Sequence, residues 1–303
     1  MPDYSDVCVL IPTLDEAETI GGVVEAFHDR GFDEVLVVDG HSTDGTRKIA
    51  REHGARVVEQ SGAGKGQAVR EGVEHVERPY VLMLDGDGTY RAEDADAMLE
   101  PLFEGRAEHV IGDRFAEMED GAMSTLNGVG NSIINRSFSF IHGHDFRDIL
   151  SGYRAFTVES FERMHLTADG FAIETEMAVE CAKHDIQTRV VDITYLDRPD
   201  ESDTNLRPFR DGARIIFALY KLAKTNNPLF YFGSVGAGST LVGFVTALYV
   251  AVEWVTVGVS HNIMALFAAF TVLLGIQLLM FGVLSDLLVT LHREQLRRLE
   301  NRD

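Results

Sequence analysis

Two aspartates stand one glycine apart at the end of an apolar run, in the stretch YVLMLDGDGTY at residues 80–90. Carboxylate oxygens are the ligands that Mg²⁺ and Mn²⁺ prefer, so Asp85 and Asp87 are candidates to hold a divalent cation. A surface turn after a buried strand fits the same letters, and Asp94 and Asp96 repeat the spacing. The elements around each pair must decide between a site and a solvated turn.

Up to about residue 200, short apolar runs alternate with amphipathic ones. Strands are predicted at 7–13, 34–40, 55–60 and 80–87, and helices from Asp15 onward, at 43–53 and at 66–77. Such alternation, with strands that are apolar throughout, predicts an α/β domain with a mainly parallel sheet covered on both faces. Ligands bind beyond the carboxyl ends of such strands, so Asp39, Asp85 and Asp87 are expected on one rim.

The second aspartate pair lies in a different kind of segment. Residues 91–103 read RAEDADAMLEPLF, a pattern that predicts a helix with Ala95 and Met98 turned inward. Asp94 and Asp96 are therefore interpreted as surface groups and not as a second metal site.

The composition limits the classes of partner. The 303 residues include 48 Asp+Glu against 27 Lys+Arg, for a net charge of −21. Nucleic acid is not expected as a partner, because its phosphates would be repelled. Only five of the basic residues are lysine, and this acidic, lysine-poor balance is typical of proteins from salt-loving archaea. Cys8 and Cys181 are expected to be buried free thiols, and they suggest neither a disulfide framework nor a zinc site.

The C-terminal third has a membrane-like composition. No charged side chain lies between Lys224 and Glu253, or from Trp254 to Ser285. A helix needs about 20 residues to cross a hydrocarbon core of ~30 Å. Transmembrane helices are therefore predicted at 229–252 and 262–284, with a buried helical hairpin of a soluble protein as the alternative.

Basic residues flank this hairpin on one side. Lys221 and Lys224 precede it, and Arg293, Arg297 and Arg298 follow it, which predicts that this side is cytoplasmic. The chain does not open with a signal-peptide pattern. We therefore expect a multi-pass protein of the cell membrane with its catalytic domain and both termini in the cytoplasm.

Four regions are expected along the chain. They are a cytoplasmic domain, an amphipathic and basic helix at the membrane surface, a two-helix transmembrane hairpin and a basic cytoplasmic tail, at 1–205, 206–226, 227–290 and 291–303.

Six motifs in fixed order carry a resemblance to a known family. They are IPTLDE, VVDGHSTDGT, GKGQAVREG, MLDGDGTY, IGDR and RDILSGYRAF, at 11–16, 37–46, 64–72, 83–90, 111–114 and 147–156. The chain resembles the family 2 glycosyltransferases, and among them the polyprenyl-phosphate hexosyltransferases that make dolichyl-phosphate glucose or mannose. The resemblance runs from residue 7 to about residue 220 and implies a GT-A-like nucleotide-sugar-binding domain.

The resemblance implies a donor site built from several motifs. Pro12, Thr13 and Glu16 would flank the nucleotide, Asp39 would accept a hydrogen bond from its base, and Lys65 would approach the diphosphate.

The resemblance also implies a metal site. Asp85 and Asp87 would hold Mg²⁺ or Mn²⁺, which neutralises the departing diphosphate. The family often has a glutamine two residues further on, where this chain has Thr89 as the third candidate ligand.

The implied acceptor, dolichyl phosphate, needs cations more than a general base. A phosphate monoester has a second pKa of ~6, so it is already a nucleophilic anion at neutral pH. Arg114, Arg154 and Arg198 are the candidates to hold it, with surface ion pairs as the alternative role for each.

The expected activity is transfer of a hexose, with inversion, from a nucleotide-diphosphate sugar to dolichyl phosphate, supplying lipid-linked sugar for protein N-glycosylation. The GKGQAVREG stretch favours UDP-glucose, and GDP-mannose is the alternative donor. A polysaccharide acceptor or a non-catalytic membrane-tethered scaffold are the other hypotheses. The oligomeric state stays open, a homo-oligomer included.

Overall fold

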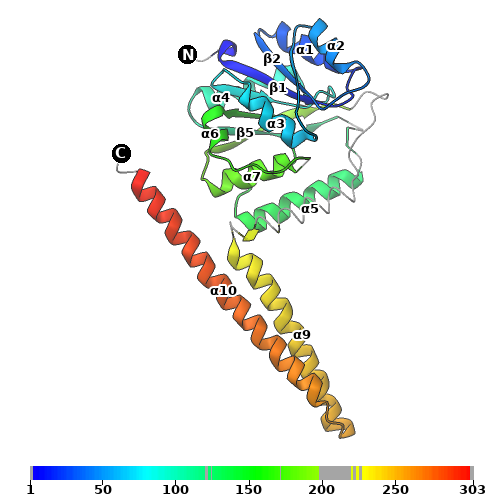
Figure 1. Cartoon of the computed structure of the whole chain (residues 1–303), viewed down its shortest axis with the longest axis vertical. Helices are drawn as coiled ribbons and strands as arrows, with labels where there is room; N and C mark the ends of the chain where they lie inside the picture. Colours follow the sequence, from blue (N-terminus) through cyan, green and yellow to red (C-terminus); the bar gives the residue numbers. More distant parts are fainter. Residues whose placement is uncertain are drawn as a thin grey trace. The chain divides into compact units, whose positions relative to one another are not determined.

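The computed structural model describes residues 3–119, 122–123, 125–170, 172–197, 220, 223–224 and 227–300. The chain divides into two compact units, Met1–Leu219 and Tyr220–Asp303 (Figure 1). Most of the predicted interface helix, 206–226, lies outside the described residues, so that helix stays a prediction.

The first unit is built on one seven-stranded sheet in its described part. Its strands are β1 (Val7–Thr13), β2 (Glu34–Asp39), β3 (Arg56–Glu59), β4 (Tyr80–Met83), β5 (His109–Met118), β6 (Arg154–Thr157) and β7 (Thr188–Tyr195). They follow the order β3-β2-β1-β4-β6-β5-β7. All neighbours are parallel except β6, which runs antiparallel to β4 and β5. The predicted, mainly parallel sheet is confirmed.

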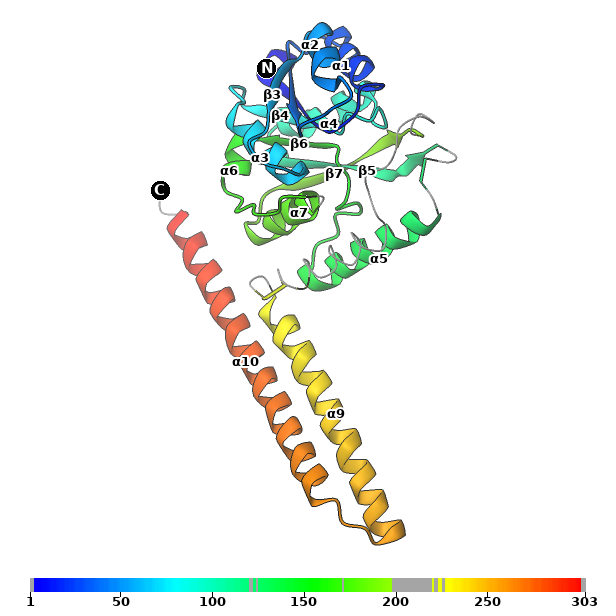
Figure 2. The same cartoon turned by 45° about the vertical axis from the view of Figure 1, so that its right-hand side comes forward.

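Helices cover both faces of this sheet (Figure 2). They are α1 (Ile20–Asp29), α2 (Thr46–Glu52), α3 (Lys65–Glu74), α4 (Ala95–Phe103), α5 (Thr125–His142), α6 (Val158–Glu162) and α7 (Ile173–Lys183), with the short 3-10 helices η1 (Tyr4–Asp6) and η2 (Ala92–Asp94). Val9 and Ile11 of β1 belong to the core that α1 and α4 complete. Leu10 points to the other face, where it lies against Gly72 of α3.

Helix α1 begins five residues later than the sequence predicts. Residues 14–19 form turns instead, because side chains of the following loop bind their backbone. Asp15 N donates to Ser42 Oγ at 2.9 Å, and Glu16 N donates to Thr46 Oγ1 at 2.9 Å. The acidic cluster at Asp15–Glu18 therefore belongs to a loop at the rim and not to a helix.

The second aspartate pair lies where expected. Ala95 and Met98 of α4 are fully buried. Asp96 is exposed and forms an ion pair with Arg30 at 2.5 Å, while Asp94 accepts a hydrogen bond from Thr194 N at 2.9 Å. Neither carboxylate lies at a strand end, so this pair is surface structure.

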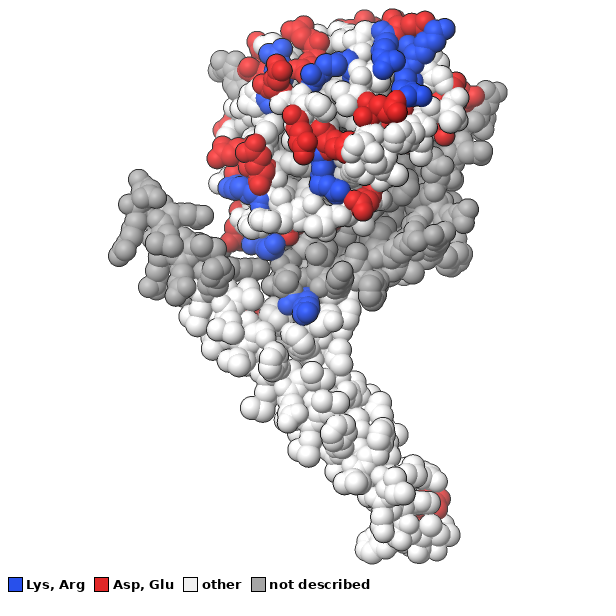
Figure 3. Space-filling model, in the orientation of Figure 1, with Lys and Arg blue, Asp and Glu red and all other residues white. Residues whose placement is uncertain are grey.

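The second unit is a hairpin of two helices, α9 (Pro228–Val257) and α10 (Asn262–Glu300), which run side by side in opposite directions (Figure 1). Both are long and apolar enough to cross a membrane, and they contain the predicted spans at 229–252 and 262–284. Few of their residues are buried, whereas the core helix of a soluble protein is mostly buried. On the face that Figure 3 shows, the described part of this hairpin is almost free of charged side chains.

Small residues let the two helices of the hairpin approach closely. A Cβ atom built on Gly236 of α9 would lie 2.7 Å from the carbonyl oxygen of Gly275 in α10. A Cβ on Gly243 would lie 2.8 Å from the carbonyl oxygen of Ala268. Close backbone contact at glycine is typical of helices that associate in lipid. Helix α10 continues to Glu300, so most of the predicted tail at 291–303 is helical.

The two cysteines give a test of the core. Both are free and buried, and burial raises the pKa of each thiol to about 12. Because the thiolate is the reactive form, neither Cys8 nor Cys181 should be alkylated by iodoacetamide at pH 8 in the folded protein. Mass spectrometry should find both alkylated after denaturation, and labelling of either without denaturant would contradict the fold.

Candidate active site

Three neighbouring strands end in buried polar side chains. Thr13 closes β1 and pairs with Asp39 at the end of β2. Gln60 follows β3, and its N–H donates to the carbonyl oxygen of Asp39 at 3.0 Å. Thr13, Asp39 and Gln60 are at most 6 % exposed. Parallel strands bring them together because their carboxyl ends share one edge of the sheet.

Each of these three side chains keeps one atom without a hydrogen-bond partner in the described part of the chain. The atoms are Thr13 Oγ1, Asp39 Oδ1 and Gln60 Oε1. A buried polar atom left unsatisfied costs about 1–3 kcal/mol, so the trio is suited to a ligand that brings hydrogen-bond donors. Gln60 was missed in the sequence, although its place directly after the third strand could have pointed to it.

Only one oxygen of Asp39 is open to such a ligand. Its Oδ2 accepts from Ser42 N at 3.0 Å and lies 3.4 Å from Arg47 Nε. Gly40 then keeps Gln60 in place, because a Cβ there would come within 3.2 Å of Gln60 Nε2.

The 40–46 loop is locked onto the turn that follows β1. Asp44 accepts from Ala17 N at 2.9 Å and from Thr46 Oγ1 at 2.6 Å. Burial opposes ionisation of Asp44, but the hydrogen bonds from Thr46 and Ala17 hold the pKa of its carboxyl below the usual value. Asp44 is thus a structural anion that holds the 40–46 loop against the turn after β1. Pro12, in β1, and half-buried Glu16, in that turn, lie on the segment that Asp44 contacts.

Lys65 bridges two carboxylates at the centre of the rim. As the first residue of α3, it places its Nζ against Asp85 Oδ1 and 2.5 Å from Glu174 Oε1. Glu174 comes from α7, 109 positions further along the chain, and is nearly fully buried. Nothing in the local sequence marked Glu174 as a site residue, because only the fold brings it beside Lys65.

Charge balance holds this cluster together. Burial alone would lower the pKa of Lys65, but the carboxylates of Asp85 and Glu174 raise it above its ordinary value. Burial raises the pKa of Asp85, Lys65 opposes that shift, and the negative charges of Asp87 and Glu174 add to it. Two acids contact one ammonium, and Asp87 adds a third negative charge near Asp85, so the cluster favours the arrival of a further cation.

Asp87 is held in place by the residue two positions later. Its Oδ1 accepts from Thr89 N at 3.1 Å and from Thr89 Oγ1 at 2.7 Å. The Thr89 hydroxyl therefore orients the carboxylate, in addition to being a candidate ligand itself. Asp87 is 4 % exposed and lies on the same loop as Asp85.

Two glycine positions show how tightly other loops approach this cluster. A Cβ on Gly152 would lie 2.5 Å from Asp85 Oδ2, so the SGYR motif can approach the Asp85 loop this closely only with a glycine at position 152. Gly66 N donates to the carbonyl oxygen of Asp169 at 3.0 Å, and a Cβ on Gly66 would meet Ala168 O at 2.0 Å. Glycine at position 66, beside Lys65, therefore allows the start of α3 to pack directly against the α6–α7 loop.

Arg114 forms a buried, bidentate ion pair with Asp148. Its Nε donates to Asp148 Oδ2 at 2.7 Å and its second terminal nitrogen donates to Oδ1 at 2.9 Å. The guanidinium also lies 5.4 Å from the centre of the Tyr195 ring. Burial would lower the pKa of Arg114, but the Asp148 carboxylate raises it well above the ordinary value.

Arg154 has a different environment from the one its motif suggested. It is fully buried, and its donors go to the carbonyl oxygens of Ser151 and Ile149, at 3.1 and 2.7 Å, and to His109. These contacts favour a role in shaping the SGYR loop over direct contact with a phosphate. Arg198 lies outside the described residues.

A pocket of about 700 Å³ is lined on one side by Phe115, the residue that follows Arg114 in β5. It lies between the end of β5, the helix α5 and the loop that follows α5. Its lining combines two arginines, two phenylalanines and small polar groups: Phe115, Ser132, Asn135, Arg136, Ser139, Phe140, Asp145 and Arg147. Arg147 is committed to Asp113 and Asp192. Arg136 has no ion-pair partner among the described residues, so its positive charge faces an open, partly apolar space.

Helix α5 carries apolar side chains on its exposed face as well as on its buried face. Its inner face is buried through Ile134, Phe138 and Ile141. Its outer face exposes three large apolar side chains, Val129, Ile133 and Phe140, at 54 %, 51 % and 76 %. With Arg136 they follow an i, i+4, i+7, i+11 spacing, which places all four on one stripe of the helix. Neither Arg136 nor this stripe was singled out in the sequence.

Comparisons with known proteins agree with this geometry. The family model described as "Glycosyl transferase family 2" matches residues 8–164. Glycosyltransferase AglJ of Haloferax volcanii is 65% identical over 301 residues, 99% of either chain. A dolichyl-phosphate hexose transferase of the same organism is 35% identical over 222 residues, covering 72% of this chain and 94% of the relative.

Solved structures show the same fold. Glucosyl-3-phosphoglycerate synthase of Mycobacterium tuberculosis, crystallised with UDP, superposes with a TM-score of 0.58 at 20% identity, over 72% of this chain and 79% of that one. The family match covers more than half of the chain, and the similarity to glycosyltransferase AglJ spans 99% of it. This chain is therefore a glycosyltransferase and belongs to glycosyl transferase family 2.

Proposed function

We propose that this enzyme transfers glucose from UDP-glucose to dolichyl phosphate at the cytoplasmic face of the membrane, supplying lipid-linked sugar for protein N-glycosylation. The observation that carries the proposal is that one catalytic unit combines two features. Its rim keeps Thr13 Oγ1, Asp39 Oδ1 and Gln60 Oε1 without partners in the described part of the chain, and its pocket pairs an apolar stripe with Arg136, which has no ion-pair partner among the described residues. The similar dolichyl-phosphate hexose transferase supports the acceptor class.

The choice of nucleotide follows from the single open oxygen of Asp39. Uracil offers one ring N–H, which Asp39 Oδ1 can accept. Guanine offers a ring N–H and an amino group side by side, and a carboxylate binds this pair most favourably when each of its two oxygens accepts one hydrogen bond. Because Oδ2 is committed to Ser42 and Arg47, the site favours UDP over GDP.

This choice gives a direct binding test. UDP should bind at least about 10-fold more tightly than GDP, and Asp39→Asn should weaken UDP binding by about 10- to 100-fold, the value of a hydrogen bond to a charged group. Isothermal titration of both nucleotides measures it, with Asp29→Asn on the exposed end of α1 as the control. Tighter binding of GDP would make GDP-mannose the donor.

Asp85 and Asp87, with Thr89 beside them, are the proposed holders of Mg²⁺ or Mn²⁺. Their oxygens are hard ligands of the kind these ions prefer, and the crowding of acids around Lys65 fits a further cation. A bound ion would supply positive charge for the diphosphate that leaves. A structural neighbour crystallised with Mn²⁺ and UDP-glucose, at a TM-score of 0.57, supports this assignment. Lys65 lies in the same cluster and is proposed to contact the diphosphate.

The acceptor phosphate is proposed to enter the pocket lined by Phe115 and Arg136. A phosphate oxygen attacks the anomeric carbon, the bond from that carbon to the diphosphate breaks, and no proton must be removed because the phosphate is already ionised. Attack opposite the leaving group inverts the configuration. Arg136 would hold the phosphate, and Arg114, through its pair with Asp148, would shape the pocket wall. Arg198 stays a candidate from the sequence alone.

The apolar stripe of α5 supports a lipid as the carrier of this phosphate. Val129, Ile133 and Phe140 would rest at the membrane surface, as amphipathic helices do. The candidate spans α9 and α10 keep the enzyme at a membrane, and the basic residues flanking them favour a cytoplasmic catalytic unit.

Arg136 provides the acceptor test. Arg136→Gln removes the charge and keeps most of the side-chain length, so KM for dolichyl phosphate should rise about 10- to 100-fold while KM for UDP-glucose stays within about twofold. Steady-state kinetics in detergent micelles measure both. Arg51→Gln, an exposed arginine on α2, is the control, and an unchanged acceptor KM in Arg136→Gln would exclude this pocket.

Lipid extraction tests the function itself. The purified full-length enzyme is incubated with dolichyl phosphate, Mg²⁺ or Mn²⁺, and radiolabelled UDP-glucose, UDP-galactose or GDP-mannose in parallel. We expect label in the organic phase with UDP-glucose and a β-linked product from the α-linked donor. Absence of lipid-extractable label with every donor would overturn the proposal and favour a non-catalytic role.

A further inference from the structure

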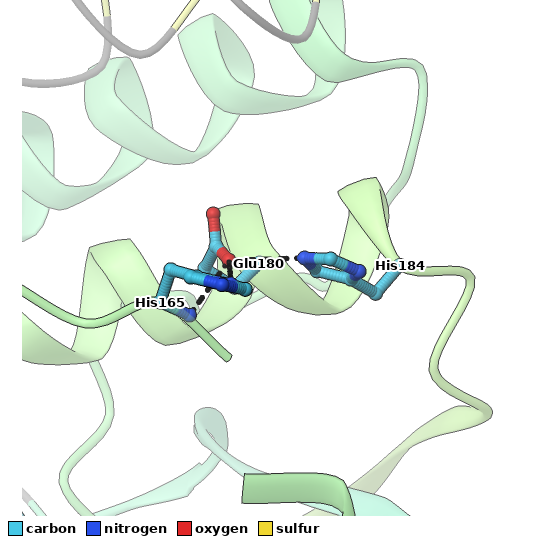
Figure 4. A group of neighbouring side chains, drawn as sticks. All are labelled: His165, Glu180 and His184. Atoms are coloured by element: carbon cyan, nitrogen blue, oxygen red, sulfur yellow. Dashed lines mark hydrogen bonds and ion pairs between the residues drawn. The ribbon is translucent and has the colours of Figure 1, made fainter. Parts of the chain in front are cut away.

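Three side chains that bind transition metals converge away from the rim. His165 lies on the loop after α6, Glu180 is in the last turn of α7, and His184 follows that helix (Figure 4). Their ligand atoms all lie within 4.8 Å of one another. We propose that His165, Glu180 and His184 form a structural site for Zn²⁺ or a similar transition-metal ion, separate from Asp85 and Asp87.

The distances are close to those of a coordinated ion. Glu180 Oε2 lies 3.2 Å from His184 Nε2 and 3.9 Å from His165 Nδ1. Bonds of about 2.0–2.1 Å in a tetrahedral zinc site put ligand atoms a little over 3 Å apart, so Glu180 and His184 already match and His165 must approach slightly. The His165 side chain is 77 % exposed on a loop and has room to do so.

The carboxylate is fixed before any ion arrives. Glu180 is buried, and its Oε1 accepts from Lys183 Nζ at 2.9 Å. Oε2 accepts from the backbone N–H of His165 at 2.9 Å, so the same oxygen that meets both imidazoles is oriented by the loop itself. Hydrogen bonds of this kind orient ligands and tune metal sites.

The ligand set selects the kind of ion. Two imidazole nitrogens and one carboxylate oxygen suit Zn²⁺, Co²⁺ or Ni²⁺, whereas Mg²⁺ prefers oxygen ligands alone. Exposure of His165 leaves a side of the site open to water as a fourth ligand. No cysteine is needed, which is why the cysteine count of the sequence did not reveal it.

An ion bound at this cluster would stabilise the loop between α6 and α7. Backbone hydrogen bonds tie the α6–α7 loop to α7. His165 N donates to Glu180. Further along the loop, Thr167 N and Ala168 N donate to Glu176. The next residue of the loop, Asp169, accepts from Gly66 N and pairs with Arg70 of α3. An ion at the cluster would therefore clamp the loop that supports the turn around Lys65.

Metal titration of the full-length protein tests this inference. After chelator treatment and buffer exchange, Co²⁺ should produce visible ligand-field absorption with nitrogen-ligand character, and Zn²⁺ should abolish it by competition at one ion per chain. Zn²⁺ should also raise Tm, because an ion that binds the folded state stabilises it. Mg²⁺ in excess should leave the cobalt spectrum unchanged, which separates this site from the aspartate pair.

Variants decide whether these residues are the ligands. His165→Ala changes an exposed side chain and should fold normally, yet it should weaken Co²⁺ and Zn²⁺ binding by at least about 100-fold, since loss of supporting groups alone costs 10- to 100-fold. His184→Ala should do the same. His75→Ala, an exposed histidine at the end of α3, should bind as the wild type does. Unchanged binding in His165→Ala and His184→Ala, or no cobalt spectrum in the wild type, overturns the proposal, whatever the donor specificity proves to be.

Discussion

Replacement of Asp87 by asparagine should lower kcat/KM for hexose transfer by at least about 10²-fold, because the cation that Asp87 is proposed to hold would supply several kcal/mol of charge stabilisation at the leaving diphosphate. Asparagine keeps an oxygen that can accept the hydrogen bonds from Thr89 N and Oγ1, so the loop should keep its conformation. Initial rates with UDP-glucose and dolichyl phosphate at saturating Mn²⁺ measure the effect.

Asp96→Asn is the matched control for this experiment. It belongs to a similar Asp-x-Asp pair, but it lies on α4 and contacts Arg30 at the surface. Its activity should stay within about twofold of the wild type, since exposed ion pairs contribute little. Equal losses in both variants would mean that general acidity, and not a specific cation site, supports turnover. Full activity in Asp87→Asn would remove Asp87 from the proposed metal site.

The second large effect is on folding. Arg114→Met should lower the free energy of unfolding by about 3–5 kcal/mol, because it leaves the Asp148 carboxylate buried without its partner. Asp148 is fully buried, and besides the guanidinium contacts its Oδ2 lies 3.3 Å from Arg114 N. Chemical denaturation of the full chain in detergent, followed by far-UV circular dichroism, measures the loss.

The double variant Arg114→Met/Asp148→Leu separates charge from packing. It removes both buried charges, so much of the lost stability should return, although the proposed acceptor pocket beside Phe115 should lose its shape and transfer should stay low. Arg30→Met, which breaks the exposed pair with Asp96, should cost less than about 1 kcal/mol. A small effect of Arg114→Met, comparable to Arg30→Met, would show that the buried pair contributes little to the stability of the fold.

Much of the fold could be predicted because its signals are local. The run VCVLIPT is apolar throughout and flanked by polar residues, and β1 occupies the same residues, 7–13. The charge-free runs likewise predicted α9 and α10, since length and apolarity suffice to identify such helices. The start of α1 was predicted wrongly because Ser42 and Thr46, which bind the backbone of residues 15 and 16, come from a loop more than 25 residues away.

The candidate site could be predicted in part, for the same reason. Asp39, Asp85 and Asp87 end apolar strands, and a parallel sheet alone places such residues on one rim. Gln60 was overlooked, since an amide after a strand is ordinary until burial leaves its Oε1 without a partner. The motif of Arg154 pointed to phosphate, but the fold turns that guanidinium inward to the SGYR loop.

The sequence by itself determined the sheet, the paired aspartates at its edge and the apolar hairpin, because each depends on residue type and spacing within one segment. Only the tertiary structure decided which distant side chains meet. Glu174 joins Lys65, Asp148 neutralises Arg114, and His165 approaches Glu180 through contacts that span 15 to 109 positions. Burial and charge compensation set those partnerships, and neither quantity exists until the chain has packed.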